Sequence, residues 1–172
     1  MASKYLAASL AAIVGILLLP VAAAQVESAE TSSANNRPTV RESYLPVGRA
    51  APDQAKLVYY RAATDTKSAS GANVYVDQRF HASLQPAGFT VFCLAPGAHF
   101  IGAFTDDAPL YRGKHEQLYR VELEAGSTYF VRTSTDGSGA PVSVERDEAE
   151  RELHNARNQV RFVSRAPTQP CK

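Results

Sequence analysis

The sequence predicts a mainly β protein, an antiparallel β-sandwich of about seven or eight short strands with one C-terminal α-helix. From residue 55 onward, short β-branched and aromatic runs alternate with turn sequences rich in Gly, Pro, Asp and Ser. Residues 119–124 alternate between apolar and charged side chains, which predicts a buried face made by Tyr119, Val121 and Leu123. A helical period replaces this alternation near residue 147.

Each predicted strand is bounded by turn-forming residues. Pro86 and Gly88 separate two of them, and residues 95–97, 105–107 and 136–141 supply further turns. The predicted strands are residues 56–61, 73–77, 79–84, 89–94, 99–104, 119–124, 128–133 and 142–144.

The C-terminal helix is predicted at about residues 147–164. Asp147 is a candidate cap, acidic residues occupy the first turns and arginines the later ones, which suits the helix dipole. The apolar stripe predicts docking on the protein's own sheet, although its spacing also suits a short coiled coil. Its members are Ala149, Leu153, Ala156, Val160 and Val163.

The N-terminus has the pattern of a secretory signal peptide. Lys4 precedes a short apolar run, and small residues lead to a cleavage site near Ala24-Gln25. We therefore expect a signal peptide at 1–24, a flexible leader at 25–54 and the sandwich domain at 55–172. The 148 residues that remain after removal of the signal peptide suit one domain with a core. The leader is polar except for Tyr44, Leu45 and Val47, which we expect to pack on the domain rather than form a docking segment.

The composition narrows the class of partner. Removal of Lys4 with the signal peptide leaves 17 basic and 17 acidic side chains, so nucleic acid is not an expected partner. The mature chain has no second apolar run, so we expect no membrane span in it. It has no cysteine near the cleavage site, so we expect no lipid anchor. We expect a periplasmic or outer-membrane-associated protein.

Cys93 and Cys171 both lie in the mature chain. In an oxidising compartment they are predicted to form one disulfide that ties the C-terminal end to the domain. A buried free thiol at Cys93 with a reactive or intermolecular thiol at Cys171 is the alternative.

The sequence has no strong catalytic or metal-binding signature. Its four histidines form no familiar ligand spacing, so we expect no metal site and no cofactor. Residues 137–139, Gly-Ser-Gly, lack the spacing of a nucleophile elbow, and the adjacent Asp106 and Asp107 are predicted to begin a turn. We expect no enzymatic activity and no catalytic residue. The histidines are His81, His99, His115 and His154.

The segment 105–116 is long for a hairpin connection and mixes an aromatic residue with charges. Long loops on rigid sandwiches often carry recognition. We therefore take Tyr111, Arg112 and Lys114 as the candidate binding residues, with Tyr111 stacking and Arg112 pairing with a carboxylate. The alternative is that Leu110 and Tyr111 cover the end of the sandwich.

Two motifs resemble those of known envelope proteins. Residues 74–77, Val-Tyr-Val-Asp, lead through a predicted hairpin to residues 94–99, Leu-Ala-Pro-Gly-Ala-His. This order is similar to PEGA-type sandwich domains and to a related bacterial domain family of unknown function, which also closes with an Ala-x-x-x-Leu helix like Ala149 and Leu153. The resemblance covers roughly residues 55–165 and implies a sandwich fold in the bacterial envelope.

The chain is also similar to the N-terminal half of envelope proteins that continue into an OmpA-type peptidoglycan-binding domain. The sequence ends at Lys172, so we expect that second domain to be absent.

Together these observations predict a secreted, non-enzymatic envelope protein that binds or scaffolds other envelope proteins. Two alternatives stay open. One is a carbohydrate- or peptidoglycan-binding module that uses the same loop. The other is a subunit of a larger assembly, joined through a leader that lends a strand to a neighbour's sheet edge.

Overall fold

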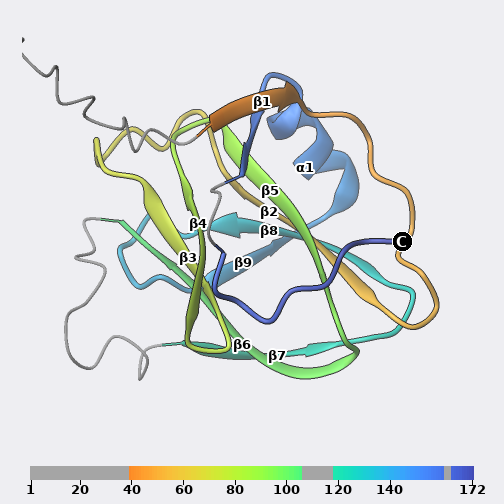
Figure 1. Cartoon of the computed structure of the whole chain (residues 1–172). Helices are drawn as coiled ribbons and strands as arrows, with labels where there is room; N and C mark the ends of the chain where they lie inside the picture. The colour runs from red at the N-terminus through yellow and green to blue at the C-terminus, as the bar shows by residue number, and fades with distance from the viewer. Residues whose placement is uncertain (1–38, 106–117, 161–163) are drawn as a thin grey trace, which may run out of the picture. The chain divides into compact units, whose positions relative to one another are not determined.

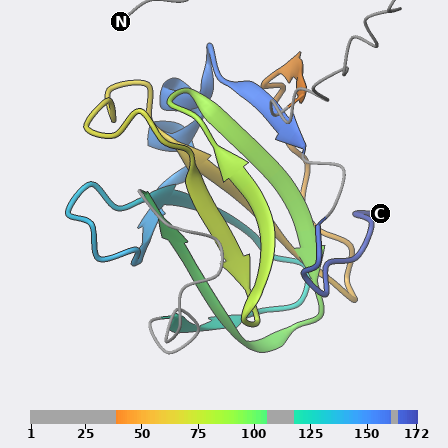
Figure 2. The ribbon, with the colours of Figure 1, turned by 60° about the vertical axis from the view of Figure 1, so that its left-hand side comes forward.

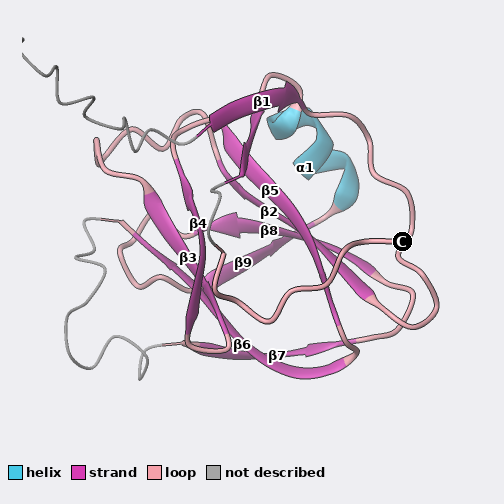
Figure 3. Ribbon diagram, viewed as in Figure 1, coloured by secondary structure: helices cyan, strands magenta, loops and turns pink. Residues whose placement is uncertain are grey.

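Two β-sheets and a single helix make up the described part of the chain, which covers residues 39–105, 118–160 and 164–172 of a computed structural model (Figure 1, Figure 3). All of these residues belong to the unit Asn36–Lys172. The elements are β1 (Thr39–Ser43), β2 (Ala55–Arg61), β3 (Ala72–Val76), β4 (Arg79–Leu84), β5 (Gly88–Leu94), β6 (Gly97–Phe104), β7 (Tyr119–Leu123), β8 (Thr128–Thr133), β9 (Pro141–Val144), α1 (Arg146–Leu153) and β10 (Arg157–Val160).

The larger sheet has the strand order β1-β10-β5-β2-β8-β9, and the smaller sheet has the order β4-β3-β6-β7. Most neighbouring strands are antiparallel, whereas β2 with β8 and β5 with β10 are parallel. The predicted mainly β sandwich with a C-terminal helix is therefore confirmed. Each of the eight predicted strands is present, with ends that differ by at most two residues.

Two further strands raise the number to ten among the described residues. β1 lies within the predicted leader, and β10 lies within the predicted helix. β1 pairs antiparallel with β10, and β10 pairs parallel with the start of β5, where Arg157 is the partner of Gly88. That pairing satisfies backbone groups at the start of β5.

The predicted extent of the helix was wrong. The helix ends at Leu153, and the backbone N–H of Ala156 donates to the Leu153 carbonyl in a turn that redirects the chain into β10. Glu145 is the residue at the N-cap and makes no side-chain capping bond, while Asp147 lies in the first turn. Tertiary pairing with β5 overrides the helical spacing of the apolar residues after Leu153.

Two apolar layers hold the three parts together. One lies between the sheets and includes Leu57, Val74 and Phe92. The other lies between the larger sheet and α1 and includes Tyr60, Ala149 and Leu153. The larger sheet is thus buried on both faces, which explains why all seven residues of β2 are buried instead of alternating.

The end of the predicted leader packs on the domain. Tyr44 is buried and its ring meets Phe89 edge-on at 5.4 Å between centroids. Val47 packs against the same layer, but Leu45 is 75% exposed. The expected packing therefore holds for two of the three apolar residues.

Candidate functional site

The C-terminal segment is tied to the domain by the predicted disulfide. Cys93 and Cys171 are bonded, with 5.2 Å between their Cα atoms. The backbone N–H of Gln169 donates to the carbonyl of Cys93 at 2.8 Å, so the segment also pairs with β5. Figure 2 shows the C-terminus ending beside that strand.

Gln54, which the sequence did not single out, binds the same segment from the other side. Its Nε2 donates to the carbonyl of Pro170 at 3.0 Å, and its Oε1 accepts from the backbone N–H of Lys172 at 3.2 Å. Gln54 is buried, so these bonds replace water that its amide would otherwise bind. The C-terminal segment is a structural clasp.

The two motifs that carry the family resemblance meet in space. Asp77 Oδ2 lies 2.8 Å from His99 Nδ1, and Asp77 Oδ1 accepts from the backbone N–H of Phe100 at 2.9 Å. The other ring nitrogen of His99 lies 2.9 Å from the carbonyl of Ala95. These contacts fix the β3–β4 turn to the start of β6. The role of these motif residues is therefore structural, because they hold the backbone of the β3–β4 turn against β6.

The predicted binding residues Tyr111, Arg112 and Lys114 lie outside the described residues. Their segment joins β6 to β7, and Tyr119 at the start of β7 pairs with Ile101, three residues before the end of β6 at Phe104. Asp106, Asp107, Leu110 and His115 also lie outside the described residues.

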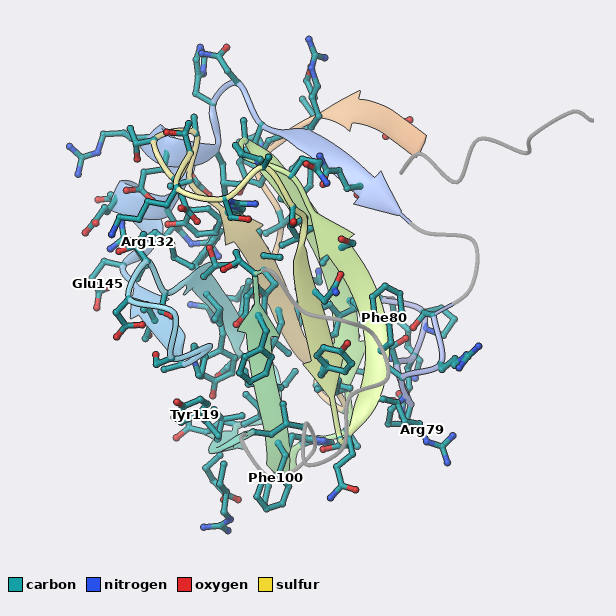
Figure 4. The ribbon with its side chains drawn as sticks, turned by 90° about the vertical axis from the view of Figure 1, so that its left-hand side faces the viewer. Arg79, Phe80, Phe100, Tyr119, Arg132 and Glu145 are labelled. Atoms are coloured by element: carbon teal, nitrogen blue, oxygen red, sulfur yellow. A yellow bond between two sulfur atoms is a disulfide. The ribbon has the colours of Figure 1, made fainter. Side chains whose placement is uncertain are left out.

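The described residues next to that segment form a candidate interaction surface, which we name the β7 edge surface. It consists of β7 and the neighbouring Phe100 of β6. Phe100 is 44% exposed and Tyr119 is 37% exposed, two of the three large apolar residues that are exposed in the described part of the chain. Figure 4 shows both at the same end of the molecule.

The charges of this surface have both signs. Arg120 lies opposite Phe100 in the β6–β7 register, and its guanidinium pairs with Glu122 at 3.1 Å on the same face. Both charged side chains are about two-thirds exposed, at 66% and 64%. The surface therefore combines apolar area with a matched pair of charges.

The sequence predicted a buried Tyr119, and this was wrong because β7 is an edge strand. Among the described residues no further strand lies on its outer side to cover the ring, and the Tyr119 hydroxyl donates to the carbonyl of Ser138 at 2.9 Å. Leu123 is buried and Val121 is half-buried, as the alternation predicts. Position within a sheet depends on long-range pairing, which local alternation does not report.

Three of the four described sheet edges are irregular, begin with a proline or are covered by another segment, which disfavours pairing with another chain. β9 begins with Pro141, which lacks an N–H, and β1 has an irregular register between Val40 and Ser43. At β4, the backbone N–H of Arg165 donates to the carbonyl of Phe80 at 2.8 Å. Among the described residues, β7 has neither proline, irregularity nor cover.

His81 is a buried, uncharged link between strands. Its Nδ1 lies 3.0 Å from the hydroxyl of Ser164 and its Nε2 lies 3.2 Å from the hydroxyl of Thr90. Burial lowers the pKa of His81 to about 4. No group of three or more potential metal ligands converges among the described residues.

A polar hollow of about 340 Å³ lies between β8 and the region of α1. Arg132 lines it and donates to Glu152 at 2.6 Å and to Glu148 at 3.2 Å. Burial and the hydrogen bond to Glu152 raise the pKa of Tyr60, whose hydroxyl donates to that carboxylate at 2.6 Å. These charges join the helix to the sheet, which is a structural role.

Residues 137–139 lie in the predicted turn. The backbone N–H of Ser138 donates to Asp136 at 2.8 Å, and the Ser138 hydroxyl is engaged by the backbone N–H of Ala140 at 3.2 Å. Hydrogen bonds from Ser138, and then from Ser134, lower the pKa of Asp136 to about 2. The serine is part of a turn network.

Within the described residues, no helix is long and apolar enough to cross a bilayer. No protein-family model, curated protein or solved structure matches the chain.

Proposed function

We propose that this chain is a secreted, non-enzymatic protein of the bacterial cell envelope that binds another protein at the β7 edge surface. The bound protein adds an extended strand beside β7, so that backbone hydrogen bonds supply affinity and side chains supply specificity. The observation that carries the proposal is the edge of β7, which no other described residue pairs with, together with the exposed rings of Phe100 and Tyr119.

The apolar area at this end favours protein as the partner. An aromatic ring that is nearly half exposed loses contact with water when a partner covers it, and aromatic residues are enriched at protein interfaces. Arg120 and Glu122, on the same face of the sheet as Phe100, can pair with charges of either sign on a partner.

The proposed location rests on the N-terminal signal-peptide pattern and on the cysteines. Disulfides persist in the periplasm and outside the cell, where thiols are not kept reduced. The pairing of Cys93 with Cys171 fits such a compartment.

Tyr111, Arg112 and Lys114 belong to the proposal as additional contact residues. Their segment connects the two strands that form the β7 edge surface. A partner strand beside β7 therefore passes close to the point where this segment meets the start of β7.

Site-specific photo-crosslinking tests the proposal. A photo-reactive amino acid replaces Arg120 in the full chain, which is exported to the periplasm and irradiated in intact cells. We expect a protein adduct from position 120. The matched control is the same replacement at Ser143, an exposed residue of β9, which is an edge strand of the other sheet. Equal adducts from both positions, no adduct from 120, or an adduct to glycan alone would contradict the proposal.

A further inference from the structure

The five residues of β7 are complementary to a second copy of themselves. When two such strands run antiparallel with Val121 opposite Val121, Arg120 of each copy faces Glu122 of the other. Tyr119 then faces Leu123 across the junction in both places. Opposite charges and apolar pairs at directly opposed positions are the contacts that stabilise antiparallel strands.

We propose that two copies of this chain associate through their β7 edges about a two-fold axis at Val121. The two four-stranded sheets become one continuous sheet of eight strands with order β4-β3-β6-β7-β7-β6-β3-β4. This inference rests on the proposed function and names the partner of the same surface, a second copy of the chain. The interface is isologous, because the same patch contributes on both sides.

The faces of the sheet agree with this arrangement. Residues that are directly opposed on antiparallel strands lie on the same face. Arg120 and Glu122 share the outer face with Phe100, so the two charge pairs form beside two exposed rings, one from each copy. On the inner face, the half-buried Val121 and the exposed Tyr119 gain cover from the partner strand.

The Arg120–Glu122 pair within one copy is easily exchanged for the same pair formed between two copies. Arg120 and Glu122 lie on one strand, both are largely exposed, and such pairs contribute little to stability. Exchange therefore costs little, and antiparallel pairings centred on Arg120 or on Glu122 instead of Val121 place two like charges opposite each other. The charges select this register more than they supply affinity.

An unrelated strand would bind here only if its charges were in an order complementary to that of β7. A second copy of β7 has that complementary order because the two copies are related by symmetry. The Arg-Val-Glu order places opposite charges at equal distances from the central valine. This symmetry is the reason for choosing a second copy as the occupant of the edge.

Charge reversal tests the inference. The mature, disulfide-bonded protein is studied by sedimentation over a wide range of concentrations, as wild type and as the variants Arg120→Glu and Glu122→Arg. Wild type should dimerise. Each variant places like charges at both pair positions, so we expect dimerisation about tenfold weaker or worse.

An equimolar mixture of the two variants gives the decisive result. One copy then carries two acidic residues and the other two basic residues, so a heterodimer should form where neither variant dimerises alone. Arg79→Glu, an exposed change of the same charge on β4, is the control and should leave the dimer intact. Circular dichroism and the unfolding midpoint confirm that each variant is folded.

The inference is overturned if wild type stays monomeric at every concentration, if the single variants dimerise like wild type, or if the mixture gives no heterodimer. Photo-crosslinking at position 120 separates this failure from failure of the proposed function. A monomer that crosslinks to a different protein contradicts the second copy and retains protein binding. A monomer that gives no protein adduct contradicts both.

Discussion

Arg61 is a charged residue in the interior of the domain, and its ion pair and hydrogen bonds offset the cost of burying the charge. Its side chain is fully buried, and its Nε donates to Asp65 at 2.9 Å. The guanidinium also donates to the carbonyls of Ser70 at 2.6 Å and Ser68 at 2.9 Å. A buried charge is stable only when it is paired and hydrogen-bonded, and Arg61 meets both conditions.

Replacement of Arg61 by alanine should be among the most destabilising single changes in the domain. It leaves the Asp65 carboxylate and two carbonyl groups without their donor, and breaking one side of a buried pair costs about 3–5 kcal/mol. Urea unfolding measures the loss. The control is Arg151→Ala on the exposed side of α1, which should change stability by less than about 0.5 kcal/mol. Similar effects for both variants would show that the Arg61 network contributes little.

His81 should make stability fall in acid. Its pKa is about 4 in the folded protein and 6.5 for the unperturbed group, so between these values the unfolded chain binds the additional proton. The contacts of the ring, with Thr90, Ser164 and Phe92, carry no charge that would offset protonation. The contribution of His81 to the free energy of unfolding is therefore full above pH 6.5 and decreases by about 3 kcal/mol as the pH falls towards 4.

Urea titrations at several pH values measure this dependence. The variant His81→Gln keeps a polar side chain of similar reach without titrating in this range. It should be less stable at neutral pH and should lose the part of the acid sensitivity that comes from His81. An unchanged slope in this variant would assign the sensitivity to other groups.

At the scale of elements, the loop between β8 and β9 meets β6 through a glycine. Gly139 has a φ of +76°, and its carbonyl accepts from the backbone N–H of Ala103 at 2.9 Å. A Cβ placed at Gly139 would lie 2.2 Å from the ring of Phe104. The close contact holds the loop against the end of the strand.

Gly139→Ala should therefore cost more than Gly137→Ala. Both glycines have positive φ, at +76° and +81°, so both variants incur a backbone penalty of about 1 kcal/mol. Only position 139 adds a steric conflict with Phe104, because a Cβ at Gly137 meets nothing within 4 Å. We expect an additional loss of about 1–3 kcal/mol, measured as the difference in unfolding free energy between the two variants. Equal losses would contradict the close packing.

Local sequence patterns predicted where the strands lie better than they predicted which strands pair with each other. The β-branched and aromatic runs and their turns located eight strands, because those signals act within a few residues. The sequence of residues 157–160 shows no such signal, and its strand depends on an edge of β5 that is distant in the chain. The exposure of Tyr119 was missed for the same reason, since edge position follows from the order of all strands in the sheet.

At the scale of the whole molecule, both ends of the described chain are held by pairing with strands of the larger sheet. β1 pairs with β10, and the C-terminal segment pairs with β5 beside the disulfide. The compartment and the cysteine count predicted that disulfide. They contained no signal for Gln54, whose role depends on where the last residues fold back.

The disulfide should contribute more to stability than the hydrogen bonds of the clasp. Cys93 and Cys171 are 78 residues apart in sequence, and closing a loop of that length restricts the unfolded chain by about 4–5 kcal/mol in the chain-entropy model. The double variant Cys93→Ala and Cys171→Ala should therefore have a markedly lower unfolding free energy than the oxidised protein.

The reduced wild-type protein and the Gln54→Ala variant separate the two contributions. Reduction removes the covalent link but leaves the bonds of Gln54 with Pro170 and Lys172, so it should resemble the double variant in stability. Gln54→Ala keeps the link and removes those hydrogen bonds, at a cost of about 1–2 kcal/mol. If reduction costs no more than Gln54→Ala, the clasp is held mainly by its non-covalent contacts. The entropic role assigned to the disulfide would then be wrong, because the unfolded chain would already be restricted without it.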